Sequence, residues 1–147
     1  MNSIQKNTIL RSFTELDTES VIALWQACML TRPWNDPEKD IARKLTVNDE
    51  LFLVAELQGN IVGSVMGGYD GHRGWINYLA VDPEQRKLGL GKQLMLEVEQ
   101  RLLSLGCPKI NLQIRTGNEE VMAFYRAIGF TEDACVSFGK RLIPDNE

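Results

Sequence analysis

Residues 79–92, LAVDPEQRKLGLGK, join an apolar, strand-like run to a basic loop that holds two glycines. The glycines carry no Cβ, so a ligand can approach the backbone amides at the start of the helix that follows. Those amides have no partner within the helix, and the helix dipole favours a negative charge beside them. Three basic side chains, Arg86, Lys87 and Lys92, lie in the same turn. The loop therefore predicts a site for a diphosphate.

The loop differs from two other phosphate-binding motifs. A Walker loop has four residues between its glycines and then Lys followed by Ser or Thr, and the dinucleotide fingerprint reads GxGxxG. Here Gly89-Leu90-Gly91 is followed by Lys92, Gln93 and Leu94, so neither pattern fits. A glycine pair also occurs where a helix entrance needs only a tight turn. The glycines alone leave both interpretations open.

Apolar periodicity continues downstream of the loop. Residues 91–105 repeat apolar side chains at helical spacing, and Gly106 stands where a glycine commonly ends a helix. Residues 109–116 alternate and predict a strand, residues 118–128 predict a helix, and residues 135–142 predict a last strand.

Upstream of the loop, three strand-like runs predict an antiparallel meander, with Gly59 in the first tight turn. The upstream elements are strand 8–14, a helix that begins at Asp17 or Thr18 and ends before Pro33, helix 38–47, and strands 51–57, 61–69 and 75–81. The whole order predicts one mixed α/β domain over residues 1–147, with its core at about 8–142. Its central sheet is expected to be largely antiparallel and flanked by helices.

Composition excludes several classes of protein. The chain has 147 residues, 44% of them hydrophobic and 24% charged, and no apolar run approaches the ~20 residues that cross a membrane. The net charge of -4 argues against a nucleic-acid partner. Three scattered cysteines favour reduced thiols and a cytoplasmic location over a disulfide framework or a metal site.

Two motifs resemble those of a known family. Val81-Asp82-Pro83 followed by Arg86-x-x-Gly89-x-Gly91 is similar to the acetyl-CoA-binding motif of the GCN5-related N-acetyltransferases (GNAT). The second hallmark of this family lies downstream, where Asn118 is followed by Tyr125 and then by Gly129-Phe130. Both motifs stand in the family's order.

The resemblance extends over most of the chain. The predicted elements of residues 8–142 follow the family's order, and residues 32–37 and 67–74 resemble its bacterial YpeA-like branch. The resemblance implies the GNAT, or acyl-CoA N-acyltransferase, fold. It also implies transfer of an acetyl group directly from acetyl-CoA to a primary amine, either a small amine or a protein amino group, with no metal.

The resemblance further implies where acetyl-CoA binds. The pantetheine arm is expected to add like a strand beside residues 79–81, and the diphosphate to bind the amides of residues 87–92. Tyr125 is the expected general acid, because a phenol with a pKa near ~10 stays protonated at pH 7 and can donate to the leaving sulfur. Expected contacts of acetyl-CoA are Leu79, Ala80, Val81, Arg86, Lys87, Leu88, Gly89, Leu90, Gly91, Lys92, Asn118 and Tyr125.

The general base is not evident from the sequence. Some family members use a glutamate on the fourth or fifth strand, but Trp75 and Gln113 stand at the matching positions here. Neither side chain can act as a carboxylate base. Asp70 or Tyr78, acting through a water molecule, are the candidates.

Two short segments are candidates for binding the acceptor. Trp34 and Asp36 lie between the first two predicted helices, and Tyr69 and Asp70 end a predicted strand. If the segments converge, the two aspartates attract a cationic amine. Alternatively, Asp36 caps the second helix and Trp34 packs on the core.

Two other functions fit the same sequence. The missing glutamate fits a non-catalytic acyl-CoA-binding module, and transfer to a hydroxyl group is the rival reaction. The apolar run Val136-Ser137-Phe138 in the last predicted strand suggests pairing with a second subunit as a homodimer.

Overall fold

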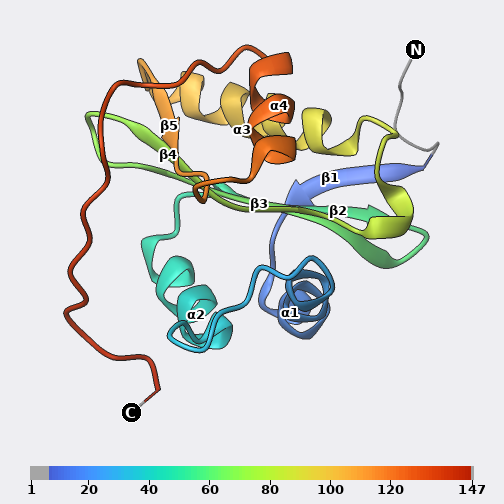
Figure 1. The fold of residues 1–147 in the computed structure, drawn as a ribbon. Coiled ribbons are helices and arrows are strands. Elements are labelled where there is room, and N and C mark those ends of the chain that lie inside the picture. Colours follow the sequence, from blue (N-terminus) through green and yellow to red (C-terminus); the bar gives the residue numbers. More distant parts are fainter. Residues whose placement is uncertain (1–6, 147) are drawn as a thin grey trace.

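A five-stranded sheet forms the centre of the computed structural model, which describes residues 7–146 (Figure 1). The strands lie in the order β1-β2-β3-β4-β5, and the first four pair antiparallel. Only β5 runs parallel to its neighbour β4. The strands are β1 (Thr8–Ser12), β2 (Phe52–Leu57), β3 (Asn60–Tyr69), β4 (Gly74–Val81) and β5 (Ile110–Leu112).

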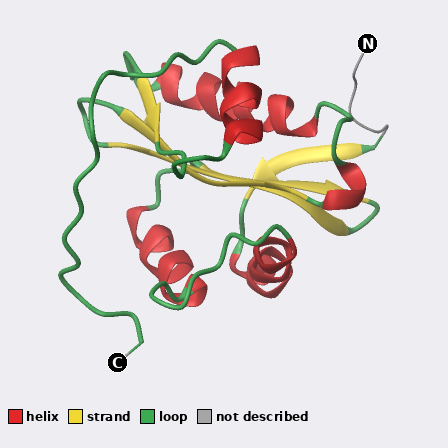
Figure 2. Cartoon of the chain, viewed as in Figure 1, coloured by secondary structure: helices red, strands yellow, loops and turns green. Residues whose placement is uncertain are grey.

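Helices cover both faces of this sheet (Figures 1 and 2). Helices α1 and α2 lie on one face, and α3 and α4 lie on the other. This arrangement confirms the mixed α/β fold with a largely antiparallel sheet. The helices are α1 (Thr18–Ala27), α2 (Pro37–Val47), α3 (Leu90–Ser104) and α4 (Glu119–Ala127), with short 3-10 turns η1 (Glu15–Asp17) and η2 (Pro83–Gln85) before α1 and α3.

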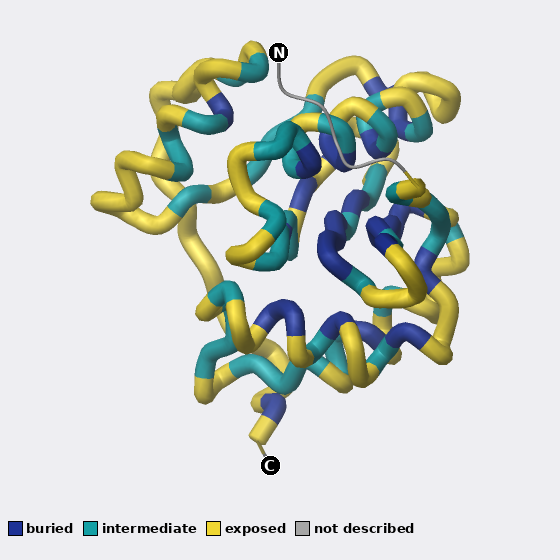
Figure 3. The backbone as a smooth tube through the Cα atoms, turned by 90° about the vertical axis from the view of Figure 1, so that its right-hand side faces the viewer, coloured by how far each residue is buried: buried dark blue, intermediate teal, exposed yellow. Residues whose placement is uncertain are grey.

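Two apolar layers form because strand side chains alternate between the two faces of the sheet. Leu53 and Val65 point to the layer beneath α3, whereas Val54 belongs to the layer beneath α1. Burial is concentrated in the strands and in the helix faces that cover them (Figure 3). Within residues 7–146, no helix has both the length and the apolar character needed to cross a membrane.

The prediction of a last strand at residues 135–142 is wrong. These residues form no strand, and Val136 and Phe138 are 81% and 92% exposed. The predicted strand 109–116 is also reduced to β5, which has three residues. Because a strand is stabilised by the backbone of a neighbour, the short β5 offers residues 135–142 too little edge to pair with. The expected dimer contact therefore has no preformed strand.

Asp17 joins β1 to α1 through a buried carboxylate. Its oxygens accept hydrogen bonds from the Arg11 guanidinium at 2.8 and 2.9 Å and from the Thr14 amide at 2.8 Å. Arg11 also binds Glu56 of β2 at 2.8 Å. The hydrogen bond from Arg11 is the main reason that the pKa of Asp17 lies below its usual value.

We expect Asp17→Asn to lower the free energy of unfolding at pH 7 by about 1–2 kcal/mol. Because the pKa is lower in the folded state, the contribution of the charge is present above the unfolded pKa of ~4 and is lost as pH falls through the folded value. Urea titrations of both proteins at pH 7 and pH 3 measure this. The difference in free energy of unfolding between the wild type and Asp17→Asn should be smaller at pH 3 than at pH 7. An equal difference at both pH values would contradict a stabilising role for the Asp17 charge.

Candidate active site

A break in the regularity of β4 lies at the centre of the site. Two β4 residues, Tyr78 and Leu79, stand opposite the single β3 residue Val65, and the register shifts there. The backbone of Tyr78 has a φ of 53°, in the left-handed region that a tyrosine rarely adopts. Bulges of this kind bend their strand and increase its twist. The two halves of β4, before and after the bulge, therefore run in different directions.

The bulge lies just beyond the end of pairing between β4 and β5. The described pairing covers only Gly74–Ile76 of β4, so residues 77–81 present an edge without a neighbouring strand. The carbonyl oxygen of Val81 accepts a hydrogen bond from Arg86 Nε at 3.1 Å and from Cys28 Sγ at 3.2 Å. An open strand edge can bind an extended ligand through its backbone groups.

The glycine loop connects this edge to the N-terminus of α3. Lys87 and Gly89 have φ values of 68° and 86°, and these left-handed residues turn the chain from η2 into the helix. Gly89 is the N-cap of α3, so no side chain caps the helix, and its first turn holds no acidic residue. The first amides of α3 thus remain available to an anion.

The surroundings of the loop fit a diphosphate. Arg86, Lys87 and Lys92 are exposed, and none of them forms an ion pair within residues 7–146. A Cβ at Gly91 would lie 3.3 Å from Cζ of Phe124, so glycine allows the start of α3 to pack closely on α4. Free amides and positive charges without an ion-pair partner among the described residues occur together here.

Tyr125 of α4 stands beside the same edge. Its ring makes edge-to-face contacts with Phe124 and Phe130, with centroids 5.1 and 5.4 Å apart, and it belongs to the apolar cluster of Leu79 and Leu90. Burial raises the pKa of Tyr125 to about 12.

The hydroxyl of Tyr125 has no hydrogen-bond partner among residues 7–146. In the same range, no buried side-chain oxygen or nitrogen lacks a partner. The hydroxyl oxygen of Tyr125 is therefore not fully buried, and solvent or a ligand can reach it. A protonated phenol with an open side is suited to donate a proton.

Asn118 acts locally at the start of α4. Its side-chain carbonyl accepts a hydrogen bond from the amide of Val121 at 3.3 Å and so caps the helix that carries Tyr125. The side chain is exposed, and its NH₂ group forms no hydrogen bond with the described residues. The structure thus shows Asn118 as a helix cap whose donor group is still available.

Tyr69 and Asp70 lie away from this site. The Asp70 carboxylate accepts hydrogen bonds from the amides of His72 and Arg73 at 2.8 Å each, which closes the turn before β4. These backbone bonds hold the pKa of Asp70 below its usual value. A strand rises ~3.3 Å per residue, so Gly74 and Val81 are roughly 23 Å apart. The structure places Tyr69 and Asp70 at the hairpin that joins β3 to β4, at the opposite end of β4 from the glycine loop.

Trp34 and Asp36 lie on the side of the sheet that carries α2. The Asp36 carboxylate accepts hydrogen bonds from the amides of Glu38 and Lys39, so Asp36 is the cap of α2. Trp34 is 50% exposed and does not pack in the core. Its ring faces the guanidinium of Arg115 at 5.9 Å, just beyond the end of β5.

Tyr78 points toward α2, where its hydroxyl donates a hydrogen bond to Asp40 Oδ2 at 2.7 Å. Burial and the neighbouring Asp40 carboxylate both raise the pKa of Tyr78 far above its usual value. Tyr78 is therefore protonated at neutral pH and is not itself a base. The Asp40 carboxylate, which also pairs with Arg43 at 3.4 Å, is the acid group bonded to Tyr78 that can accept a proton.

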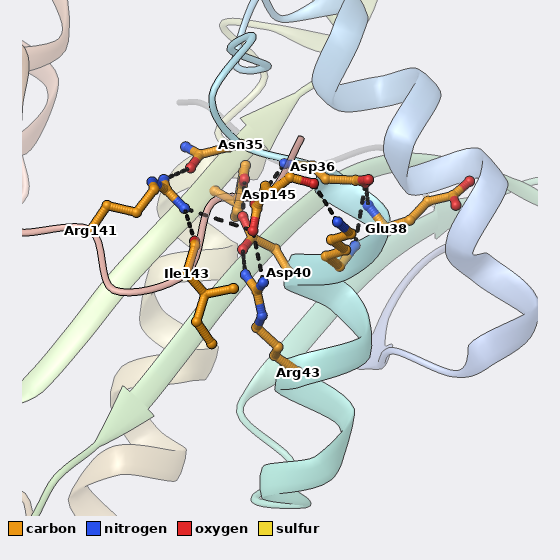
Figure 4. A network of polar contacts seen from close by, with 10 residues as sticks. Asn35, Asp36, Glu38, Asp40, Arg43, Arg141, Ile143 and Asp145 are labelled. Carbon is orange, nitrogen blue, oxygen red and sulfur yellow. Dashed lines mark hydrogen bonds and ion pairs between the residues drawn. The ribbon is translucent and has the colours of Figure 1, made fainter. Parts of the chain in front are cut away.

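The segment after α4 reaches the loop that carries Trp34 and Asp36 (Figure 4). The buried carboxylate of Asp145 accepts hydrogen bonds from the Asp36 amide at 2.8 Å and from Arg43 of α2 at 2.7 Å. Arg141 binds the side chain of Asn35. This network fixes the entrance of α2.

Sequence reasoning missed Asp40, Asp145 and Ser64, whose hydroxyl binds the Tyr78 carbonyl at 2.9 Å. Their partners are remote in the chain, since 38 residues separate Asp40 from Tyr78 and 102 separate Arg43 from Asp145. No local spacing signals such contacts.

Neither a metal cluster nor a disulfide forms part of the site within residues 7–146. No group of three or more His, Cys, Asp or Glu side chains there could hold a metal ion. Cys28, Cys107 and Cys135 are free thiols. The thiol of Cys28 contacts the backbone of the open edge at the Val81 carbonyl oxygen.

Comparison with known proteins adds a family. Residues 11–130 match the family model described as the acetyltransferase (GNAT) family. An acetyltransferase of Pectobacterium atrosepticum is 51% identical over 138 residues, which make up 94% of this chain and 98% of that protein.

Solved structures show the same fold. Ard1 from Thermoplasma volcanium has a TM-score of 0.76 and 27% identity, over 88% of this chain and 86% of that one. The glucosamine-6-phosphate N-acetyltransferase from Arabidopsis thaliana has a TM-score of 0.70, over 94% and 100% of the two chains. At 22% identity, the second likeness concerns the fold alone.

Proposed function

Because this chain belongs to the GNAT family of acetyltransferases, we propose that it transfers an acetyl group directly from acetyl-CoA to a primary amine. Family membership makes it an acetyl-CoA-dependent acyltransferase. The acceptor is proposed to be an amine, either a small amine or a protein amino group, and the roles of individual residues are proposed as well. One observation carries these roles. The open edge of β4 at residues 77–81 lies beside the uncapped N-terminus of α3.

The cosubstrate supplies an acetyl thioester when bound. Backbone groups of Leu79–Val81 would hold its pantetheine arm as an added strand, and the amides of residues 87–92 would hold its diphosphate. The unpaired charges of Arg86, Lys87 and Lys92 support this placement. A backbone amide near Val81 would polarise the carbonyl oxygen.

Tyr125 is proposed as the general acid. It donates its phenolic proton to the departing sulfur, and its high pKa keeps that proton in place until the thiolate forms. The apolar contacts with Phe124 and Phe130 fix the ring and leave the hydroxyl open. No covalent enzyme intermediate is required.

Asp40 is proposed as the proton acceptor, acting through a water molecule, with the Tyr78 hydroxyl holding its carboxylate in place. The reaction needs a free amine. At pH 7, deprotonation costs about 4.6 kcal/mol for a lysine of pKa ~10.4 and about 1 kcal/mol for an α-amino group near ~7.8. A nearby carboxylate can take up this proton, which makes Asp40 more important for a lysine-like acceptor.

Two observations support an amine acceptor entering from the α2 side. The exposed ring of Trp34 and the carboxylate of Asp40 both lie on this side, and together they suit a cation with apolar carbon atoms. The solved enzyme from Arabidopsis thaliana is named for the amine glucosamine 6-phosphate.

An acceptor screen tests the proposal. We expect the purified chain with acetyl-CoA to release free thiol only when a suitable amine is added, and mass spectrometry should find an acetylated product. The panel should pair amines, such as glucosamine 6-phosphate and peptides with free N-termini, with hydroxyl analogues that lack the amine.

Hydroxylamine treatment separates the two reactions, because it cleaves acetyl esters and leaves acetyl amides intact. An ester product would show that the acceptor is a hydroxyl group and not an amine. Release of thiol without any acetylated product would contradict acetyl transfer altogether.

A further inference from the structure

A chain of buried polar contacts leads from α1 through β3 to the bulge of β4. Trp25 and Ser64 are both 0% exposed. The indole Nε1–H of Trp25 donates to Ser64 Oγ at 2.9 Å, and the Ser64 hydroxyl donates to the carbonyl oxygen of Tyr78 at 2.9 Å. One hydroxyl thus satisfies a buried donor and a buried acceptor, and its loss leaves both unpaired.

The side chain of Tyr78 is held as firmly as its backbone. Its ring stacks on Trp25 with centroids 3.7 Å apart and planes 7° from parallel, and its hydroxyl binds Asp40. Contacts therefore hold the residue at its carbonyl, its ring and its hydroxyl. A left-handed tyrosine is unfavourable and persists only where its surroundings impose it.

We propose that Ser64 and Trp25 are positioning residues for acetyl-CoA, because they hold Tyr78 in the bulge that opens β4 from β5. This inference rests on the proposed function, in which acetyl-CoA lies along Leu79–Val81. Neither side chain touches the reacting atoms. Both act through the backbone of β4.

The bulge controls which backbone groups face the ligand. Successive residues of a strand point in opposite directions. If the extra residue of the bulge joins the regular strand, the register of the following residues shifts by one, and each of them then faces the opposite way. Release of Tyr78 into extended backbone would shift Leu79–Val81 in this way. Only a fraction of the molecules would then have the edge in its binding-competent form. The apparent Kd for CoA would equal the intrinsic Kd divided by that fraction.

Ser64→Ala tests this inference with CoA itself as the probe. If the competent fraction falls to between a tenth and a fifth, the Kd for CoA measured by calorimetry rises about five- to tenfold. The KM for acetyl-CoA should rise by the same factor, while kcat at saturation stays within about twofold of the wild-type value.

Val21→Ala is the matched control. Val21 is 0% exposed, lies one turn before Trp25 in α1 and packs in the same cluster, but its side chain has no polar group. It should lower the melting temperature without changing the Kd for CoA. Trp25→Phe removes the indole donor and part of the ring volume but keeps an aromatic ring at this position, so it should weaken CoA binding even if Ser64→Ala does not fold.

The inference is overturned if Ser64→Ala or Trp25→Phe folds, melts earlier and still binds CoA within twofold of the wild type. Such variants would show that the contacts are only structural. A wild-type chain that does not bind CoA would instead overturn the proposed function, and this inference with it.

Discussion

A Tyr125→Phe variant is expected to lose about 100-fold or more in kcat while its Kd for CoA stays within twofold of the wild-type value. The substitution removes one hydroxyl and keeps the ring that contacts Phe124 and Phe130. Because that hydroxyl has no partner among residues 7–146, its removal leaves no described group unsatisfied. Steady-state kinetics, calorimetry with CoA and thermal melting measure the three quantities.

The raised pKa of Tyr125 predicts the pH dependence of this loss, and the size of the kcat loss distinguishes an acid from a structural tyrosine. Burial raises the pKa of Tyr125 to about 12, so the phenol keeps its proton throughout the range in which the enzyme can be assayed. The ratio of wild-type to variant kcat should therefore stay constant from pH 7 to pH 10. A variant that retains at least a third of the wild-type kcat, with the same CoA affinity, would remove Tyr125 from the mechanism.

Gly89→Ala is expected to weaken CoA binding by about tenfold or more. Gly89 has a φ of 86°, and an L-residue in that region costs roughly 1–2 kcal/mol. Relief of this strain would turn the peptides at the N-terminus of α3, whose amides are expected to bind the diphosphate, away from their present direction. Calorimetry with CoA measures the loss.

Gly106→Ala provides the control at the other end of α3. Its φ is also 86°, and an added Cβ there would meet nothing within 4 Å. Both variants should lower the free energy of unfolding by a similar amount, but only Gly89→Ala should lose CoA affinity. Equal affinities in the two variants would show that the loop does not bind the diphosphate.

Elements with a strong local pattern are predictable from the sequence. Residues 91–105 repeat apolar side chains at helical spacing, and α3 spans Leu90–Ser104. The four strands upstream of the glycine loop are recovered within two residues at each end. The predicted strand 135–142 fails because alternation describes one strand, whereas pairing depends on the length of the edge beside it.

The candidate site divides along the same line. Lys87–Lys92 and Tyr125 follow from motifs, since loop glycines and a helix residue keep their places relative to near neighbours. Asp70 has the side chain that a general base needs, but its carboxylate already accepts hydrogen bonds from the turn amides of His72 and Arg73. The carboxylate beside Tyr78 is Asp40, which no motif marks.

Local pattern in the chain is enough to establish the mixed α/β class, the glycine loop at the start of α3 and the family resemblance. These features depend on backbone preference and on side-chain period, which act between residues close in sequence. Folding alone brings Trp25, Ser64 and Asp40 around Tyr78 and opens β4 from β5. A strained backbone and a buried hydrogen bond exist only when several remote segments pack together, so their positions become visible only in three dimensions.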